Sequence, residues 1–222
     1  MNWKIIYEDE AMLVAQKPQG MPTQADKTGD LDLLSALEQH CGHSLGLIHR
    51  LDRPVGGLLV FAKTKKAEAA FAKQMQDGIL EKHYRTVLCG KMQEEKGTLV
   101  DYLKKNMRTN LSEVVSPKDK MGKKAVLHYE VLETKTLENQ RFSLVEIQLE
   151  TGRHHQIRVQ TAHAGAPIWG DKKYNSQFQK VGRTEIALWA YSLKGLHPIT
   201  GKPWVFEAIP MEGIFHIFYG KS

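Results

Sequence analysis

The chain has 222 residues, of which 41% are hydrophobic and 25% charged, the balance of a globular protein with a substantial core. No apolar run reaches about 18 residues and the first residues lack a signal-peptide pattern, so we expect a cytoplasmic protein without a membrane span. Two distant cysteines, Cys41 and Cys89, argue against a disulfide framework or a zinc site. A net charge of +6 suits an anionic partner such as nucleic acid.

The first part of the chain predicts two strands and a helix. Residues 3–7 and 12–16 have the pattern of short strands, and Lys17-Pro18-Gln19-Gly20 ends the second. Asp30 can cap a helix that Gly42 ends. The apolar face of this helix would consist of Leu33, Leu34, Leu37 and Cys41. Such a face indicates packing rather than chemistry.

Asp52 lies in a cationic loop that leads into a strongly apolar strand. Residues 57–62 are an almost continuous apolar run, which is typical of an interior strand. The loop before this run carries His49, Arg50 and Arg53 beside Asp52. Asp52 on its own reads as a turn aspartate that caps its loop. Because nearby cations favour an ionised carboxylate, it is also a candidate nucleophile or base that needs no metal.

A helix and a strand follow this loop. Residues 67–75 have helical spacing, and Gly78 is placed to end the helix. Residues 83–88 alternate well enough for a strand, with Tyr84 near its start. A tyrosine in a strand is most often part of the core. Its ring is also a suitable platform for stacking on a nucleic-acid base.

The positive charge gathers in residues 104–124, which we call the basic segment. It carries seven cations and two anions (Glu113 and Asp119), hence a net charge of +5. The cations are Lys104, Lys105, Arg108, Lys118, Lys120, Lys123 and Lys124. Pro117 and Gly122 indicate an exposed loop between strands. The segment is either a merely solvated loop or an arm that grips phosphates through Lys118, Lys120, Lys123 and Lys124.

Two more strands and a histidine-rich helix complete the pattern. Residues 125–132 and 142–149 predict antiparallel strands with one buried face, joined by a polar turn. Residues 151–165 predict a turn that opens a helix, with His154 and Arg158 on one face. The adjacent histidines, His154 and His155, would point apart on a helix, and no carboxylate lies at ligand spacing. We therefore expect no metal site.

Several motifs in the same order resemble those of the RluA-type pseudouridine synthases, which isomerise uridine in RNA. The matching segments are Lys17-Pro18-Gln19-Gly20, His49-Arg50-Leu51-Asp52, Lys82-His83-Tyr84, residues 151–158, residues 165–174 and the closing residues 188–207. The similarity runs from about Lys17 to Pro210. Val55-Gly56 stands where the family commonly has a hydroxyl residue, and Thr23-Gln24 stands in place of a usual histidine.

The resemblance implies site residues and roles. Asp52 would start glycosidic cleavage, either by attacking C1′ of the ribose or by removing a sugar proton. Arg158 would pair with Asp52, and the Tyr84 ring would pack against the uracil. The reaction requires no cofactor. Further residues expected at the substrate are His49, Arg50, Arg53, Arg153, Ile157 and Leu188, besides Lys118, Lys120, Lys123 and Lys124.

The resemblance also implies an architecture and partners. We expect a single catalytic domain over residues 1–222, of the α/β (α+β) class, with a mixed and largely antiparallel central sheet and flanking helices. Many relatives carry an additional S4 RNA-binding domain, and we expect this chain to act without one. The expected partner is structured ribosomal or transfer RNA. We expect a monomer with no obligate protein partner.

Two other classes of function remain open from the residues alone. A nucleosidase or glycosidase would also use a carboxylate at C1′, but it normally needs a second acid or a metal, and no partner carboxylate is evident. A non-catalytic RNA-binding module would explain the basic segment and would make Asp52 dispensable. The product separates the three: pseudouridine, free uracil or none.

Overall fold

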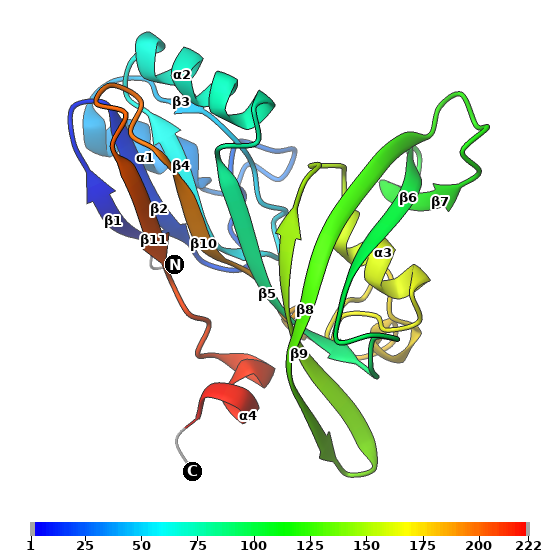
Figure 1. Cartoon of the computed structure of the whole chain (residues 1–222). Coiled ribbons are helices and arrows are strands. Elements are labelled where there is room, and N and C mark those ends of the chain that lie inside the picture. The colour runs from blue at the N-terminus through cyan, green and yellow to red at the C-terminus, as the bar shows by residue number, and fades with distance from the viewer. Residues whose placement is uncertain (1–2, 221–222) are drawn as a thin grey trace. The chain divides into compact units, whose positions relative to one another are not determined.

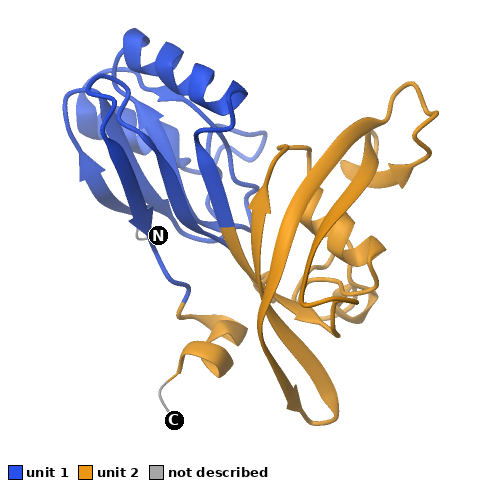
Figure 2. Ribbon diagram, in the orientation of Figure 1, with its two compact units in different colours: residues 1–83, 189–210 blue, residues 84–188, 211–222 orange. Residues whose placement is uncertain are grey.

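The structure is a computed structural model that describes residues 3–220 (Figure 1). The chain divides into two compact units (Figure 2). The first unit contains residues 1–83 and 189–210, and the second contains residues 84–188 and 211–222. Each unit is therefore assembled from two separate segments of the sequence.

The first unit is built on a mixed sheet. Its strands are β1 (Lys4–Glu8), β2 (Met12–Lys17), β3 (Gly46–Leu47), β4 (Gly56–Ala62), β10 (Leu188–Leu196, apart from its first residue) and β11 (Pro203–Glu207). They pair in the order β1-β2-β4-β10, with β11 beside β10 and β3 beside β4. The β4–β10 pair is parallel, whereas the others with a described register are antiparallel. The predicted strands at residues 3–7, 12–16 and 57–62 are confirmed.

Strand β4 is the centre of this unit because every one of its residues is buried. Its continuous apolar sequence allows this, and Leu58 and Val60 pack with Phe71 of helix α2 (Lys65–Gln76) in the core. At the start of β4 the backbone of β10 approaches closely. A Cβ on Gly57, whose φ is 120°, would lie 2.2 Å from the carbonyl oxygen of Ala190. The glycines after Asp52 therefore give room for the parallel pairing with β10.

Helix α1 (Leu33–Cys41) begins two residues later than the capping prediction implied. Asp32, not Asp30, is its N-cap, and the Asp32 carboxylate accepts a hydrogen bond from Ser35 N at 3.0 Å. Gly42 ends the helix in the left-handed conformation, as predicted. Asp30 has a different function, described below.

The second unit is an antiparallel arrangement with helices at its margin. Its strands are β5 (Glu81–Cys89, which begins in the first unit), β6 (Lys96–Asn106), β7 (Leu111–Val115), β8 (Lys123–Leu137) and β9 (Gln140–Leu149). Their order is β5-β9-β8-β6-β7. The helical elements are α3 (Gln156–His163), η1 (Ser176–Phe178), η2 (Gly213–Phe215) and α4 (His216–Tyr219). The prediction of a mixed, largely antiparallel sheet with flanking helices is confirmed.

Two predicted loops of this unit are wrong. The expected polar turn at residues 133–140 is mostly strand, because β8 runs on to Leu137 and only Glu138 and Asn139, both with positive φ, form the turn. The β-branched residues of Thr134-Lys135-Thr136 favour this extension. The basic segment is not one loop either. It contains the end of β6, all of β7 and the start of β8.

Candidate active site

The loop that carries Asp52 is fixed by contacts to a distant part of the chain. The Thr23 hydroxyl donates to the Leu51 carbonyl at 2.8 Å and accepts from the Leu51 N–H at 3.2 Å. Asp52 itself closes a tight turn, since its carbonyl accepts from Val55 N at 2.9 Å. Thr23 is buried, so both bonds are shielded from water. The backbone that presents Asp52 is therefore well positioned.

Lys17 holds the other side of this loop. The side chain is fully buried, and Nζ donates to the carbonyls of Met21 (2.6 Å), Pro18 (3.2 Å) and Arg53 (3.2 Å). Burial lowers the Lys17 pKa to about 7, with neighbouring Asp52 raising it and Arg53 lowering it. Lys17 thus links the turn after β2 to the residue that follows Asp52.

Arg53 is engaged with the loop of residues 20–30. Its Nε donates to Gly20 O at 3.0 Å and its Nη1 to Thr28 Oγ1 at 3.0 Å. The guanidinium also forms ion pairs with Asp26 and Asp30. From the sequence we expect Arg53 at the substrate, and in the structure its guanidinium pairs with two carboxylates of its own chain. The acidic composition of residues 26–30 was the signal for this contact.

His49 is partly buried, and its ring does not act as a cation. Its Nε2 accepts a long hydrogen bond from Val60 N at 3.4 Å. Burial, together with nearby Lys82, lowers the His49 pKa to about 3, so the ring is neutral at neutral pH. His49, a potential third cation beside Asp52 by its residue type, therefore adds no positive charge there. Arg50, by contrast, is exposed.

Tyr84 lies in β5 and is buried. The next residue, Arg85, points to the opposite face of the strand, where it pairs with Glu146 at 2.7 Å and donates to the Tyr219 hydroxyl at 3.5 Å. Two further predicted residues, Ile157 of α3 and Leu188 at the start of β10, are also buried.

Arg158 lies in α3, and the structure gives it a carboxylate that sequence reasoning missed. Its Nε and Nη2 donate to the two carboxylate oxygens of Asp171 at 2.8 and 2.6 Å. Both side chains are almost completely buried. The centre of the Arg158 guanidinium also lies 5.2 Å from the centroid of the Tyr174 ring. Residues 151–158 and 165–174, two separate matches to the family, are thus physically joined.

His154 and His155 lie before helix α3, although the sequence pattern predicted them within the helix. Helix α3 begins at Gln156, because His155 has a left-handed backbone with φ of 55°. The two rings are stacked with centroids 3.8 Å apart, so the expectation that they point apart is wrong. Burial and the nearby cations lower the His155 pKa to about 2. No cluster of three or more potential metal ligands occurs among residues 3–220.

The basic segment presents its lysines on an ordered framework. Asp119 organises the turn before β8: its carboxylate accepts from Met121 N at 2.8 Å and pairs with Lys104 at 3.1 Å. Arg153 is exposed, and its Nε donates to the Lys124 carbonyl at 2.9 Å. The exposed lysines of this region are Lys105, Lys118, Lys120, Lys123 and Lys124.

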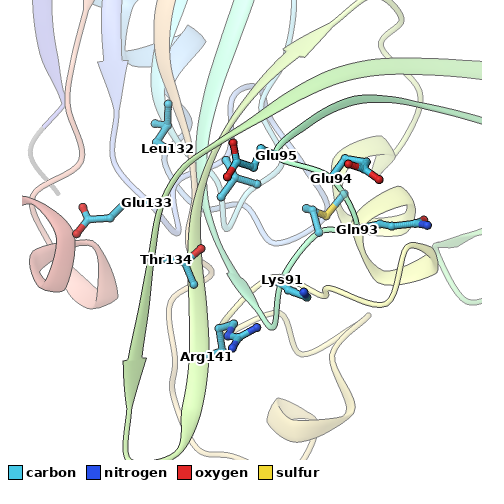
Figure 3. Close-up of a pocket in the computed structure, with 10 residues that line it drawn as sticks. Lys91, Gln93, Glu94, Glu95, Leu132, Glu133, Thr134 and Arg141 are labelled. Atoms are coloured by element: carbon cyan, nitrogen blue, oxygen red, sulfur yellow. The ribbon is translucent and has the colours of Figure 1, made fainter.

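A groove of about 440 Å³ lies elsewhere in the second unit (Figure 3). It is within the usual size range of ligand pockets. Glu94, Glu95 and Glu133 line it, with Lys91 and Arg141 as its cations. It contains none of the predicted site residues, and its three carboxylates disfavour an RNA phosphate.

In the described part of the chain, no helix is long and apolar enough to span a bilayer.

Comparison with known proteins assigns the family. Residues 11–163 match the RNA pseudouridylate synthase family. The protein YhcT of Bacillus subtilis, an uncharacterized RNA pseudouridine synthase, is 35% identical over 92% of this chain and 67% of its own length. Ribosomal large subunit pseudouridine synthase D of Zymomonas mobilis is 34% identical over 92% and 68%. Human RNA pseudouridylate synthase domain containing 1 shares the fold, with a TM-score of 0.79 and 23% identity over 95% of this chain and 84% of the human one. The chain thus belongs to the RNA pseudouridylate synthase family, whose members are isomerases.

Proposed function

We propose that this protein converts specific uridines of ribosomal or transfer RNA to pseudouridine, with Asp52 as the catalytic residue. The observation that carries the proposal is the fixed loop around Asp52. Its backbone is held by Thr23 on one side and by Lys17 on the other, next to the exposed Arg50. Such positioning suits a carboxylate that must meet one atom of a substrate.

The reaction breaks the bond between N1 of uracil and C1′ of ribose, turns the base and joins C5 to C1′. The proton on C5 leaves and N1 gains one, so no net redox change occurs. Asp52 begins the cleavage as an ionised carboxylate, which Arg158 stabilises. Tyr84 stacks on the detached uracil, and Ile157 and Leu188 form apolar walls around it. The target base must first leave its stack.

Several cations are proposed to bind the RNA backbone. Arg50 and Arg153 are exposed and suit phosphates near the target nucleotide. Lys118, Lys120, Lys123 and Lys124 would bind phosphates farther away. His49 and Arg53 would contribute through the loop they stabilise, because His49 is neutral and Arg53 is already paired with carboxylates.

Ribosomal RNA is the first substrate to test, because the name of the Zymomonas relative specifies the large ribosomal subunit. RNA labelled with tritium at uracil C5, from cells that lack this protein, is incubated with wild type or Asp52→Asn. We expect tritium release by the wild type alone, and pseudouridine rather than free uracil in the product. Fractionated ribosomal and transfer RNA identify the target class. Equal release by Asp52→Asn, or RNA binding without any release, would refute the proposal.

A further inference from the structure

The segment of residues 170–174 encloses the Arg158 side chain on two sides. Asp171 occupies one edge of the guanidinium with two short hydrogen bonds, and the guanidinium carbon lies over the Tyr174 ring, 5.2 Å from its centroid. We call Asp171 and Tyr174 the arginine cradle. A bidentate contact and a ring contact together fix both the direction and the plane of a guanidinium.

The cradle is itself held rigidly. Asp171 Oδ1 also accepts from the backbone N–H groups of Lys173 at 2.9 Å and Tyr174 at 3.3 Å. Gly170 has φ of 76°, and a Cβ there would lie 2.2 Å from the Glu185 carbonyl oxygen. The turn therefore requires glycine at this position. Asp171 is thus fixed by its own backbone before it meets Arg158.

Tyr174 is anchored through its hydroxyl. The oxygen accepts from Ser112 N at 2.7 Å, and His155 Nδ1 lies 2.7 Å away. Because His155 is neutral, its Nδ1 can accept a hydrogen bond from the Tyr174 hydroxyl, in the tautomer that carries its proton on Nε2. The ring over Arg158 is thus tied to β7 and to the residue before α3.

We infer that Asp171 is a positioning residue for the isomerisation, and that it acts by aiming Arg158. Asp171 takes two of the five guanidinium N–H groups and so determines where Arg158 directs the others. It also compensates the buried positive charge. The inference rests on the proposed function, in which Arg158 stabilises ionised Asp52. Tyr174 supports the same geometry through the contact of its ring with the guanidinium.

The test compares Asp171→Asn with wild type in single-turnover conversion of uridine and in RNA binding. We expect the rate constant to fall about tenfold to a hundredfold, since small misplacements of a catalytic group have effects of this size. RNA affinity should change less than about threefold. In an Arg158→Leu background the same substitution should change the rate less than about twofold, because its target is gone. Asp77→Asn, at the exposed end of α2, is the matched control and should have the wild-type rate.

A second measurement does not need activity. The Nε–H signal of Arg158 in ¹H–¹⁵N spectra, identified by its loss in Arg158→Leu, should exchange with water at least about tenfold faster in Asp171→Asn. If Asp171→Asn does not fold, Tyr174→Leu should show the same slow conversion and faster exchange. A wild-type rate with wild-type exchange, or an equal loss of rate in both backgrounds, would overturn the inference. An inactive wild type would overturn the proposed function instead, and the exchange rate would then decide the inference alone.

Discussion

Lys17→Met should change how the stability of the protein depends on pH. The pKa of this buried lysine falls from 10.5 to about 7 in the folded state. Between these values the unfolded chain binds more protons, so the free energy of unfolding rises with pH. A single group with these two pKa values contributes a rise of about 2 kcal/mol between pH 7 and pH 9. Lys17→Met lacks the titrating group and should lack this rise.

The assay is urea unfolding at pH 7, 8 and 9, followed by circular dichroism. Lys63→Met is the matched control. The hydrogen bond to Glu8 raises the Lys63 pKa, so this lysine stays charged throughout the range and the control should keep the rise. The difference between wild type and Lys17→Met removes the contribution of all other groups. A difference that does not change with pH would refute the assignment of a depressed pKa to Lys17.

Three further predictions concern other parts of the chain. Thr23→Val should destabilise the protein by about 2 kcal/mol and lower the rate constant for conversion, because the buried Leu51 carbonyl and N–H lose their partner. Thr23→Ser should restore the stability and the rate constant, and a wild-type rate in Thr23→Val would contradict this. Replacing Lys118, Lys120, Lys123 and Lys124 together by glutamate should weaken RNA binding, measured by filter binding. The slope of the logarithm of the binding constant against the logarithm of salt concentration should become smaller in magnitude by about three, and an unchanged slope would exclude these residues from the interface. Differential scanning calorimetry should show one unfolding transition, because each unit contains two stretches of the chain that are separated in sequence by residues of the other unit. Two separate transitions would contradict the prediction of a single domain.

The local sequence pattern was sufficient to predict those helices and strands for which the spacing of apolar residues and the residues at the turns indicate the same structure. The run at residues 57–62 became the fully buried β4, and Gly42 and Gly78 lie where α1 and α2 end. Strand β7 was missed because its five residues lie among the charges of the basic segment, and those charges favoured the prediction of an exposed loop. The hairpin between β8 and β9 was predicted, but the continuation of β8 to Leu137 was missed because polar residues in a solvent-exposed strand look like a loop.

The candidate site shows the same limit at the level of side chains. The motif around Asp52 could be identified from sequence, but the partners of its neighbours could not. Arg53 meets Asp30, and Arg158 meets Asp171, only because the folded chain brings these residues together. Composition near Asp52 suggested a cluster of free cations, whereas burial neutralises His49 and carboxylates occupy Arg53. Charge counted along a sequence does not reveal which charges are already compensated.

The parallel pairing of β4 with β10 has a consequence for folding during synthesis on the ribosome. The ribosome makes β4 before β10, and the pairs of Gly56 with Trp189 and of Gly57 with Ala190 require residues made more than a hundred positions later. While the ribosome is still synthesising the second unit, the start of β4, just after Asp52, lacks its neighbouring strand. An incomplete nascent chain therefore exposes an apolar strand end, a feature that chaperones bind and that favours aggregation. The Asp52 loop acquires its final support only after residues 189–190 have been made.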